Sequence, residues 1–216
     1  PDSAPADTAI SAAEKERNAI TLNRKTNTAF KNKNLKVTWP KIKGADGYDI
    51  YVSVCGKKFK GVTASVTGNQ NRSVMRATIK KVAGKKFKKN KTYKIRIRAY
   101  RINGDQKEYI ADGRTLHVVS DKNPVYTNAK KVQVSKKKYS IKVGKTAKIQ
   151  ASVIKQGRNK RLLPAGHGPQ LSYISSDKTI ATVSKNGKIT AKNKGKCTIY
   201  VQALNGRSKQ ITVRVR

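Results

Sequence analysis

Acidic residues are scarce in this sequence. Eleven Asp and Glu stand against fifty Lys and Arg, which gives a formal net charge of +39 over 216 residues. Repulsion among so many like charges opposes a compact state, so we expect the protein to work among polyanions. Most of the cations are lysines, which carry compact hydrated charges, whereas arginine suits planar bidentate recognition. The composition therefore favours diffuse attraction over a site that recognises one phosphate or base.

No single block of sequence carries the charge. Residues 17–123 hold 27 basic and six acidic residues, and residues 124–216 hold 22 basic residues and one acid, Asp177. A nucleic-acid-binding tail would instead concentrate its charge in one segment. Both halves of the chain are therefore expected to present cationic surfaces.

Cysteine and histidine are also rare. Cys55 and Cys197 lie far apart, which indicates two buried free thiols rather than a disulfide framework or metal site, although a bridge between the halves stays open. His117 and His167 stand apart from any sequence cluster of Cys, Asp or Glu, whereas a zinc site needs three or four ligands. We therefore expect no metal and no cofactor.

Catalytic motifs are missing as well. Residues 144–146 (GKT) lack the glycine that a phosphate-binding loop carries five residues earlier, because position 139 is Tyr. The sequence has no Gly-x-Ser-x-Gly elbow. Asp46 and Asp49 form one of the few carboxylate pairs, and on so basic a surface such acids are more typical of salt bridges than of hydrolytic catalysis. We expect that the protein is not an enzyme.

Long hydrophobic runs are absent too, since no run approaches the ~18 apolar residues of a membrane span. Residues 1–16 are small, polar and acidic, which is typical of a mature end left by processing or of an artificial chain boundary, not of a signal peptide. Residues 1–18 predict a flexible leader with at most a helical turn at residues 11–17, where Ser11 and Glu14 fit a capping box.

Short apolar runs with a period of two dominate the rest of the chain. Frequent turns separate them, the Asn103–Gly104 pair marks a hairpin, and no long helix is convincing. This pattern predicts a β-sandwich over residues 19–120. The clearest of its strands lie at residues 35–39, 48–52, 75–79, 93–99 and 108–119.

A second sandwich follows a break in the pattern. Residues 121–128 predict a linker, and seven more short strands follow within residues 129–216. A loop rich in Gly and Pro interrupts them near residues 156–170. The expected fold class is therefore all-β, with two tandem immunoglobulin-like β-sandwiches.

The first unit resembles a fibronectin type III domain of the kind common in Gram-positive surface proteins. The resemblance depends on LKVTW at residues 35–39, GADGYDIY at residues 44–51 and KTYKIRIRAY at residues 91–100. It implies that Trp39 fills the core and that Tyr93 forms a tyrosine corner, its hydroxyl returning to the backbone upstream.

The second unit is similar to the group 2 bacterial immunoglobulin-like domain of invasin- and intimin-type adhesins. The matching segments are IKVGKTA at residues 141–147, SSDKTIATV at 175–183 and NGKITA at 186–191. Tyr173 stands where the family usually has Trp, and Cys197 where a small residue is common. Both resemblances imply extracellular, non-catalytic modules for spacing, adhesion or ligand contact, and neither specifies a ligand.

Basic clusters are the candidates for binding. The most rigid is a stripe of outward-facing Lys94, Arg96 and Arg98 on one strand, beside Tyr51 on a neighbouring strand. Outward lysines also protect sheet edges and aid solubility, so a cluster alone does not establish a site. The remaining candidates lie on two expected hairpin loops and near the start of the second unit: Lys57, Lys58 and Lys60; Lys85, Lys86, Lys88 and Lys89; and Lys136, Lys137 and Lys138.

Three functions remain in competition. The first is a secreted or wall-attached surface protein of a Gram-positive bacterium, whose cations contact anionic wall polymers, host glycans or host surface proteins. The second is a nucleic-acid-binding protein that uses non-specific electrostatics, although no helix-turn-helix, zinc-finger or RNA-recognition signature is present. The third, compatible with the first, is a structural fragment of a longer chain.

Overall fold

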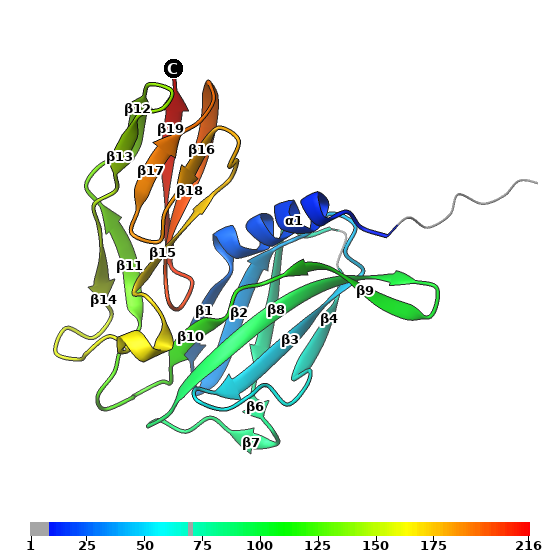
Figure 1. Ribbon diagram of the computed structural model, residues 1–216. Coiled ribbons are helices and arrows are strands. Elements are labelled where there is room, and N and C mark those ends of the chain that lie inside the picture. The colour runs from blue at the N-terminus through cyan, green and yellow to red at the C-terminus, as the bar shows by residue number, and fades with distance from the viewer. Residues whose placement is uncertain (1–8, 69–70) are drawn as a thin grey trace, which may run out of the picture.

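The computed structural model describes residues 9–68 and 71–216. Within these ranges the secondary structure is β apart from one α-helix and one short 3₁₀-helix, which confirms the predicted all-β, immunoglobulin-like fold class. The buried hydrophobic side chains form two separate cores, one drawn from residues 22–118 and the other from residues 129–215. Figure 1 shows the two corresponding units beside one another.

The first unit consists of one helix and two main antiparallel sheets. One sheet has the strand order β1-β2-β5, and the other has the order β10-β8-β3-β4 with β9 paired to β8, while β6 and β7 form a small hairpin. The elements are α1 (Ala12–Lys25), β1 (Asn27–Lys31), β2 (Asn34–Pro40), β3 (Gly47–Val54), β4 (Ala64–Thr67), β5 (Val74–Ile79), β6 (Lys81–Val82), β7 (Lys85–Lys86), β8 (Thr92–Asn103), β9 (Gln106–Asp112) and β10 (Leu116–Val119).

Alternating side chains fill the core between these sheets, because successive residues of a strand point to opposite faces. In β8 every second residue from Tyr93 to Ala99 is buried, and the residues between them are partly exposed. Trp39 is fully buried and contacts the Tyr48 ring edge-on at 5.3 Å. The Tyr93 hydroxyl accepts a hydrogen bond from the Lys88 N–H at 2.8 Å, which confirms the predicted tyrosine corner.

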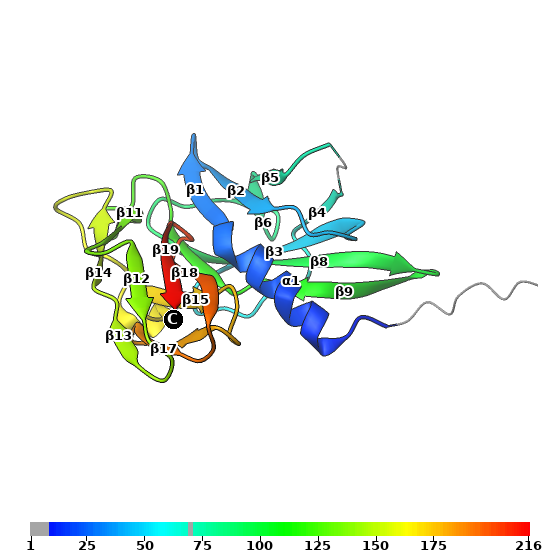
Figure 2. The same cartoon turned by 90° about the horizontal axis from the view of Figure 1, so that it is seen from above.

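The prediction of a flexible leader over residues 1–18 is wrong for its described part. The chain forms α1 from Ala12, and the Ser11 hydroxyl caps this helix by accepting from the Glu14 N–H at 3.1 Å. The helix lies along the first unit (Figure 2). Its Leu22 side chain is fully buried in the first core. Packing against the sandwich thus extends the predicted turn into a helix. Residues 1–8 of the predicted leader lie outside the described residues.

The second unit is built from shorter strands. Its sheets have the orders β12-β19-β18-β15 and β13-β17-β16, β11 pairs with β14, and β12 runs parallel to β19. The elements are β11 (Ala129–Val134), β12 (Lys138–Ile141), β13 (Thr146–Lys148), β14 (Ala151–Lys155), η1 (Ala165–His167), β15 (Leu171–Ser175), β16 (Ala181–Val183), β17 (Lys188–Ala191), β18 (Gly195–Ala203) and β19 (Ser208–Val215).

The turn between β18 and β19, residues 204–206, docks against the first unit, and we call it the docking turn. The Asn205 carbonyl accepts from the Thr28 N–H at 3.0 Å and from the Thr28 hydroxyl at 2.8 Å. The Leu204 carbonyl accepts from the His117 N–H at 2.9 Å. A Cβ atom at Gly206 would lie 2.1 Å from the Thr26 carbonyl oxygen, so the two backbones are in close contact. These contacts fix the second unit on the first.

Candidate polyanion-binding groove

A groove lined by cations begins beside the β6–β7 hairpin of the first unit and continues to the docking turn. It consists of two hollows of about 580 Å³ and about 380 Å³ that share Phe30, Ser120, Asp121 and Lys122. Asp121 is the one carboxylate among the described residues that line it. We call it the lysine groove, and its cations are Lys33, Lys80, Lys81, Lys86, Lys88, Lys89, Lys122, Lys130, Lys160 and Arg207.

The floor of the groove is aromatic. Phe30 and Phe87 meet edge-on with ring centroids 5.1 Å apart, and Phe87 contacts Tyr93 edge-on at 4.7 Å. Tyr93 is itself anchored in the first core, so the floor is held by the same residue that forms the tyrosine corner. Such edge-on aromatic pairs contribute about 0.5–1.5 kcal/mol beyond their buried area. The floor of the groove is therefore rigid.

Tight turns place the lysines at the rim. Asn32 and Lys33 join β1 to β2 with φ angles of 53° and 61°, the left-handed conformation that a two-residue hairpin turn requires. Lys122 has a φ of 60° in the segment that joins the two units. Lys81 and Lys86 lie opposite each other in the β6–β7 hairpin. The groove thus collects cations from five separate segments of the chain, which hold Lys33, residues 80–89, residues 122–130, Lys160 and Arg207.

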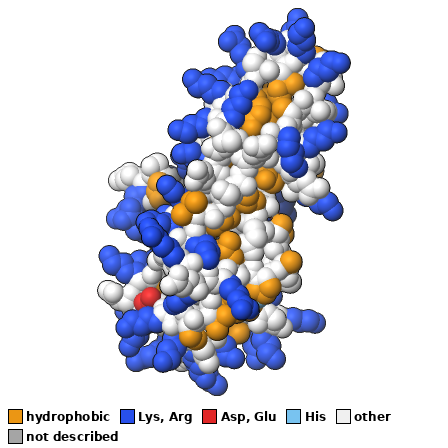
Figure 3. Space-filling model, turned by 90° about the vertical axis from the view of Figure 1, so that its left-hand side faces the viewer, with side chains coloured by type: hydrophobic (Ala, Val, Ile, Leu, Met, Phe, Trp, Pro, Cys, Tyr) orange, Lys and Arg blue, Asp and Glu red, His pale blue; other side chains and the backbone are white. Residues whose placement is uncertain are grey.

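The cations of the groove are not neutralised by the protein. The five ion pairs among the described residues involve Lys15, Arg98, Arg101, Lys107 and Lys178, none of which lines the groove. Like charges directly opposite each other, as at Lys81 and Lys86, destabilise a hairpin. A bound anion would remove this repulsion. Figure 3 shows Lys and Arg side chains over one whole face of the molecule, with acidic atoms at one place on it.

The structure brings some of the predicted loop clusters to the groove and leaves others elsewhere. Lys86, Lys88 and Lys89 line it, while their neighbour Lys85 does not. The remaining predicted lysines do not line the groove. Lys57, Lys58 and Lys60 lie on the loop that follows β3, while Lys136 and Lys137 precede β12 and Lys138 begins it. Sequence reasoning missed the other groove cations because each stands singly or in a pair beside its own turn.

The predicted stripe on β8 is present, but one of its three cations is paired. The Arg98 Nε lies 2.5 Å from the Asp112 carboxylate, and its guanidinium stacks 3.5 Å above the Tyr109 ring. Lys94 stacks over Phe59 at 4.6 Å. The Arg96 Nε donates to the Gly113 carbonyl at 2.9 Å, and Tyr51 lies opposite Arg96 in the sheet, as predicted. This face offers an anion fewer unpaired charges than the groove does.

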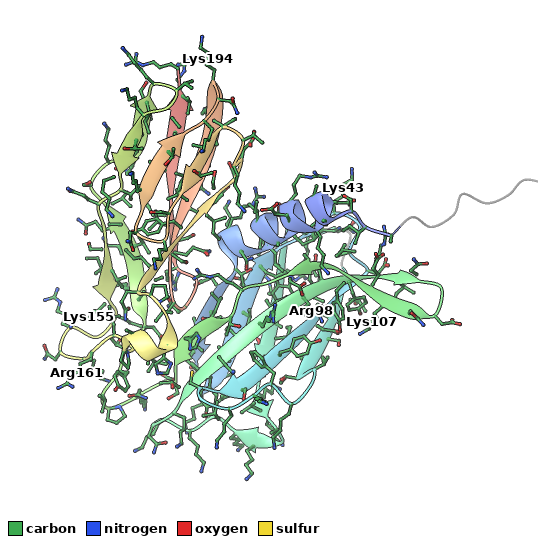
Figure 4. All side chains as sticks on the ribbon, viewed as in Figure 1. Lys43, Arg98, Lys107, Lys155, Arg161 and Lys194 are labelled. Carbon is green, nitrogen blue, oxygen red and sulfur yellow. The ribbon has the colours of Figure 1, made fainter. Side chains whose placement is uncertain are left out.

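Asp49 forms the centre of a polar network on the same sheet face. Its side chain is only 1% exposed and accepts from the Ser65 hydroxyl at 2.6 Å, the Tyr109 hydroxyl at 2.7 Å and the Lys107 ammonium at 3.0 Å. Burial raises the pKa of Asp49, but these hydrogen bonds and the Lys107 charge outweigh it and hold the pKa below its ordinary value. Figure 4 labels Lys107 beside Arg98, with the two side chains on β9 and β8. The Asp49 carboxylate therefore has a structural role, as the shared acceptor of three side chains.

The family of the second unit follows from a sequence match. Residues 128–213 match the bacterial Ig-like domain (group 2). The match covers nearly all of this Ig-like unit and confirms the resemblance inferred for residues 129–216. Domains of this family are typically extracellular or surface-associated. The first unit keeps the buried Trp39 and the Tyr93 corner on which its fibronectin type III resemblance depends.

Solved structures share only the general architecture of the chain. Domains 4 and 5 of the S-layer protein SbsC are 14% identical over 57% of this chain and 64% of that one, with a TM-score of 0.33. The intimin fragment complexed with the translocated intimin receptor is 14% identical over 84% and 57%, with a TM-score of 0.26. Domains FN1–FN3 of chicken CNTN1 are 11% identical over 88% and 64%, with a TM-score of 0.28. At these values the likenesses carry no argument about function.

The chain spans less than two thirds of the length of each of these structures. No curated protein matches it in sequence. None of the helices formed by residues 9–68 and 71–216 has the length and apolar character needed to cross a membrane.

Proposed function

We propose that this chain is a non-catalytic, extracellular module of a Gram-positive bacterium that binds linear polyanions in the lysine groove. The observation that carries the proposal is the ratio of charges along the groove, where ten cations accompany one carboxylate, Asp121. Low-dielectric walls lined by one sign of charge focus the electric field and concentrate counter-ions. The groove is the place on the described surface where such focusing combines with a rigid floor.

The form and composition of the groove favour a polymer over a small anion. Its two hollows together measure about 960 Å³ and join end to end through shared residues. Nine of its ten cations are lysines, which attract phosphate and sulfate as point charges and do not impose the planar bidentate geometry of arginine. A sulfated glycan or a polyol-phosphate wall polymer meets these requirements. The match of residues 128–213 to a family whose domains are typically extracellular or surface-associated supports such a location.

The test compares two variants that remove the same charge. The groove variant carries Gln in place of Lys81, Lys86, Lys88 and Lys89. The control variant carries Gln in place of Lys142, Lys145, Lys192 and Lys194. The control lysines are exposed at the far end of the Ig-like unit, where Figure 4 labels Lys194. Fluorescence anisotropy then measures the affinity for heparin oligosaccharide and for poly(glycerol phosphate) across salt concentrations.

We expect the groove variant to lose affinity at least about tenfold and its log–log salt slope to fall by about 3.6, since each of the four contacting lysines contributes about 0.9. The control variant should keep nearly the affinity of the parent. Equal losses in the two variants would refute the groove and leave only diffuse attraction. Binding that holds up from low to high salt would refute electrostatic binding altogether.

Nucleic acid is the alternative partner, and the same assay separates it. Single- and double-stranded DNA of several sequences are added as competitors of the labelled heparin. Displacement that follows charge density alone fits the proposal, because lysines without base-reading groups cannot distinguish sequences. A preference for one sequence or structure would favour a nucleic-acid-binding protein instead.

A further inference from the structure

Three of the four thiol and imidazole side chains in the sequence meet at one place between the two units. The Cys55 Sγ lies 3.5 Å from the His117 Nδ1, and the His117 Nδ1 lies 3.2 Å from the His167 Nδ1. One ligand atom from each of the three residues lies within 4.8 Å of the other two. Because positions 55, 117 and 167 are far apart in sequence, the sequence predicted separate residues and no metal.

Two of the three distances between these atoms agree with those between ligands of one tetrahedral ion. Zn–N bonds of about 2.05 Å and a Zn–S bond of about 2.3 Å place two nitrogens about 3.3 Å apart and a nitrogen and a sulfur about 3.5 Å apart. The measured distances are 3.2 Å and 3.5 Å. Small rotations of the His167 ring, which lies edge-on to His117, would complete the set. A fourth position would be left for water.

Backbone hydrogen bonds hold each of the three residues. Cys55 directly follows β3, and its N–H donates to the Thr92 carbonyl at 2.9 Å. His117 lies in β10, and its N–H donates to the Leu204 carbonyl of the docking turn. His167 ends η1 in the second unit, and its N–H donates to the Pro164 carbonyl at 3.0 Å. The first unit thus supplies two of the side chains and the second unit supplies one.

We propose that Cys55, His117 and His167 bind a thiophilic cation of the Zn²⁺ class and that this ion joins the two units. A thiolate with two imidazoles suits zinc or copper and excludes magnesium and calcium, which require oxygen ligands. Binding releases the thiol proton of Cys55 to solvent and involves no electron transfer. The proposal is independent of polyanion binding, since none of the three residues lines the lysine groove.

The surroundings keep the His117 imidazole neutral. Burial, His167 and the nearby Lys94 and Arg114 charges lower the pKa of His117 to about 4, so its ring is neutral at neutral pH. A metal ligand must carry a free nitrogen lone pair, and a neutral ring provides one. The same two cations repel a metal ion, whereas the Cys55 thiolate attracts it.

The experiment uses the full chain without a histidine tag. Co²⁺ is titrated as a spectroscopic probe, because a cobalt–thiolate bond gives a charge-transfer band in the near ultraviolet. Zn²⁺ affinity is then measured by competition with a chromophoric chelator. We expect one ion per chain, and affinities at least about 100-fold weaker for Cys55→Ser and for His167→Gln, since even second-shell partners change metal affinity 10–100-fold. Cys197→Ala, which removes the other thiol, should bind like the parent chain.

The joining role has its own measurement. Zn²⁺ should slow hydrogen exchange of the His117 amide, which donates across the interface to Leu204. If the thiolate band is absent from the parent chain, or persists in Cys55→Ser, the proposed metal site is refuted. The three side chains would then form only a hydrogen-bonded polar cluster. Metal binding that leaves the His117 amide unaffected would overturn the joining role. If Cys55→Ser fails to fold by circular dichroism, His167→Gln, on the short η1 turn, decides the question.

Discussion

Exchange of Gly206 for Ala should separate the two units. Gly206 has a φ of +94°, which costs a residue with a Cβ about 1 kcal/mol. The added Cβ would also lie 2.1 Å from the Thr26 carbonyl oxygen and 2.8 Å from the Asn27 Cα. Both atoms belong to the backbone where α1 passes into β1, so neither can rotate away as a flexible side chain would.

The loss can be estimated from the contacts that the docking turn makes. The clash moves the turn away, which breaks two hydrogen bonds from Thr28 to Asn205 and one from His117 to Leu204. At about 1 kcal/mol for each, the docking loses about 3 kcal/mol in addition to the φ strain. Each unit keeps its own core, so secondary structure should survive while the docked arrangement is lost.

Gly144→Ala is the matched control. Gly144 has a φ of +77° in a turn of the second unit, but a Cβ there meets nothing within 4 Å. It should therefore cost about 1 kcal/mol from backbone strain alone. Urea unfolding measures the stability of both variants, and small-angle X-ray scattering measures their dimensions. Hydrogen exchange measures the protection of the Thr28 amide. If Gly206→Ala has the same dimensions, the same protection of the Thr28 amide and the same stability as Gly144→Ala, the reasoning is refuted.

Two further changes test the first unit. Tyr93→Phe removes the acceptor of the Lys88 N–H and should lower the free energy of unfolding by about 1 kcal/mol, and an unchanged urea midpoint would contradict the corner's contribution. Asp49→Asn should cost about 2 kcal/mol at pH 7, because a charged acceptor of three side chains becomes neutral. Since the folded pKa of Asp49 is lowered, its contribution is present above the unfolded value of about 3.9 and fades as pH falls through the folded pKa. The difference between parent and Asp49→Asn should therefore shrink below about pH 4, and a constant difference would contradict the assignment.

Many of the strands could be predicted from sequence because period-two patterning is a local property, although residues 108–119 were predicted as one strand and form parts of β9 and β10. Alternation around Ile95 and Ile97 indicated which side chains are buried and which face outward, as the structure has them. The helix α1 could not be predicted in full, because Ile20 and Leu22 are its only large apolar residues and two such neighbouring positions give no helical period. Its stability comes from contacts with strands that lie far along the chain.

Both candidate sites depend on long-range placement, which local patterns do not contain. The lysine groove combines residues from Lys33 to Arg207. The cysteine–histidine cluster joins Cys55 to His117, which lies 62 positions later, and His117 to His167, which lies another 50 positions later. Clustered lysines such as those within residues 85–89 could be predicted as binding candidates because they lie close together in the sequence. Single cations such as Lys33 and Lys122 gained their place in the groove only through the turns that carry them.

The few carboxylates hold the fold together instead of neutralising the surface. Asp49 and Asp112 pair with cations on one sheet face, Asp46 accepts from the Ile102 N–H, and Asp177 accepts from the Thr179 N–H. Each of these acids contacts its own unit, so most of the lysines receive no internal counter-charge. The units nevertheless dock, because the docking turn contacts the first unit through neutral backbone groups and because the Glu16–Lys178 ion pair and the Arg114 hydrogen bond to the Ala203 carbonyl also join the two units. A polyanion in the groove would therefore relieve the repulsion that the protein's own acids leave in place.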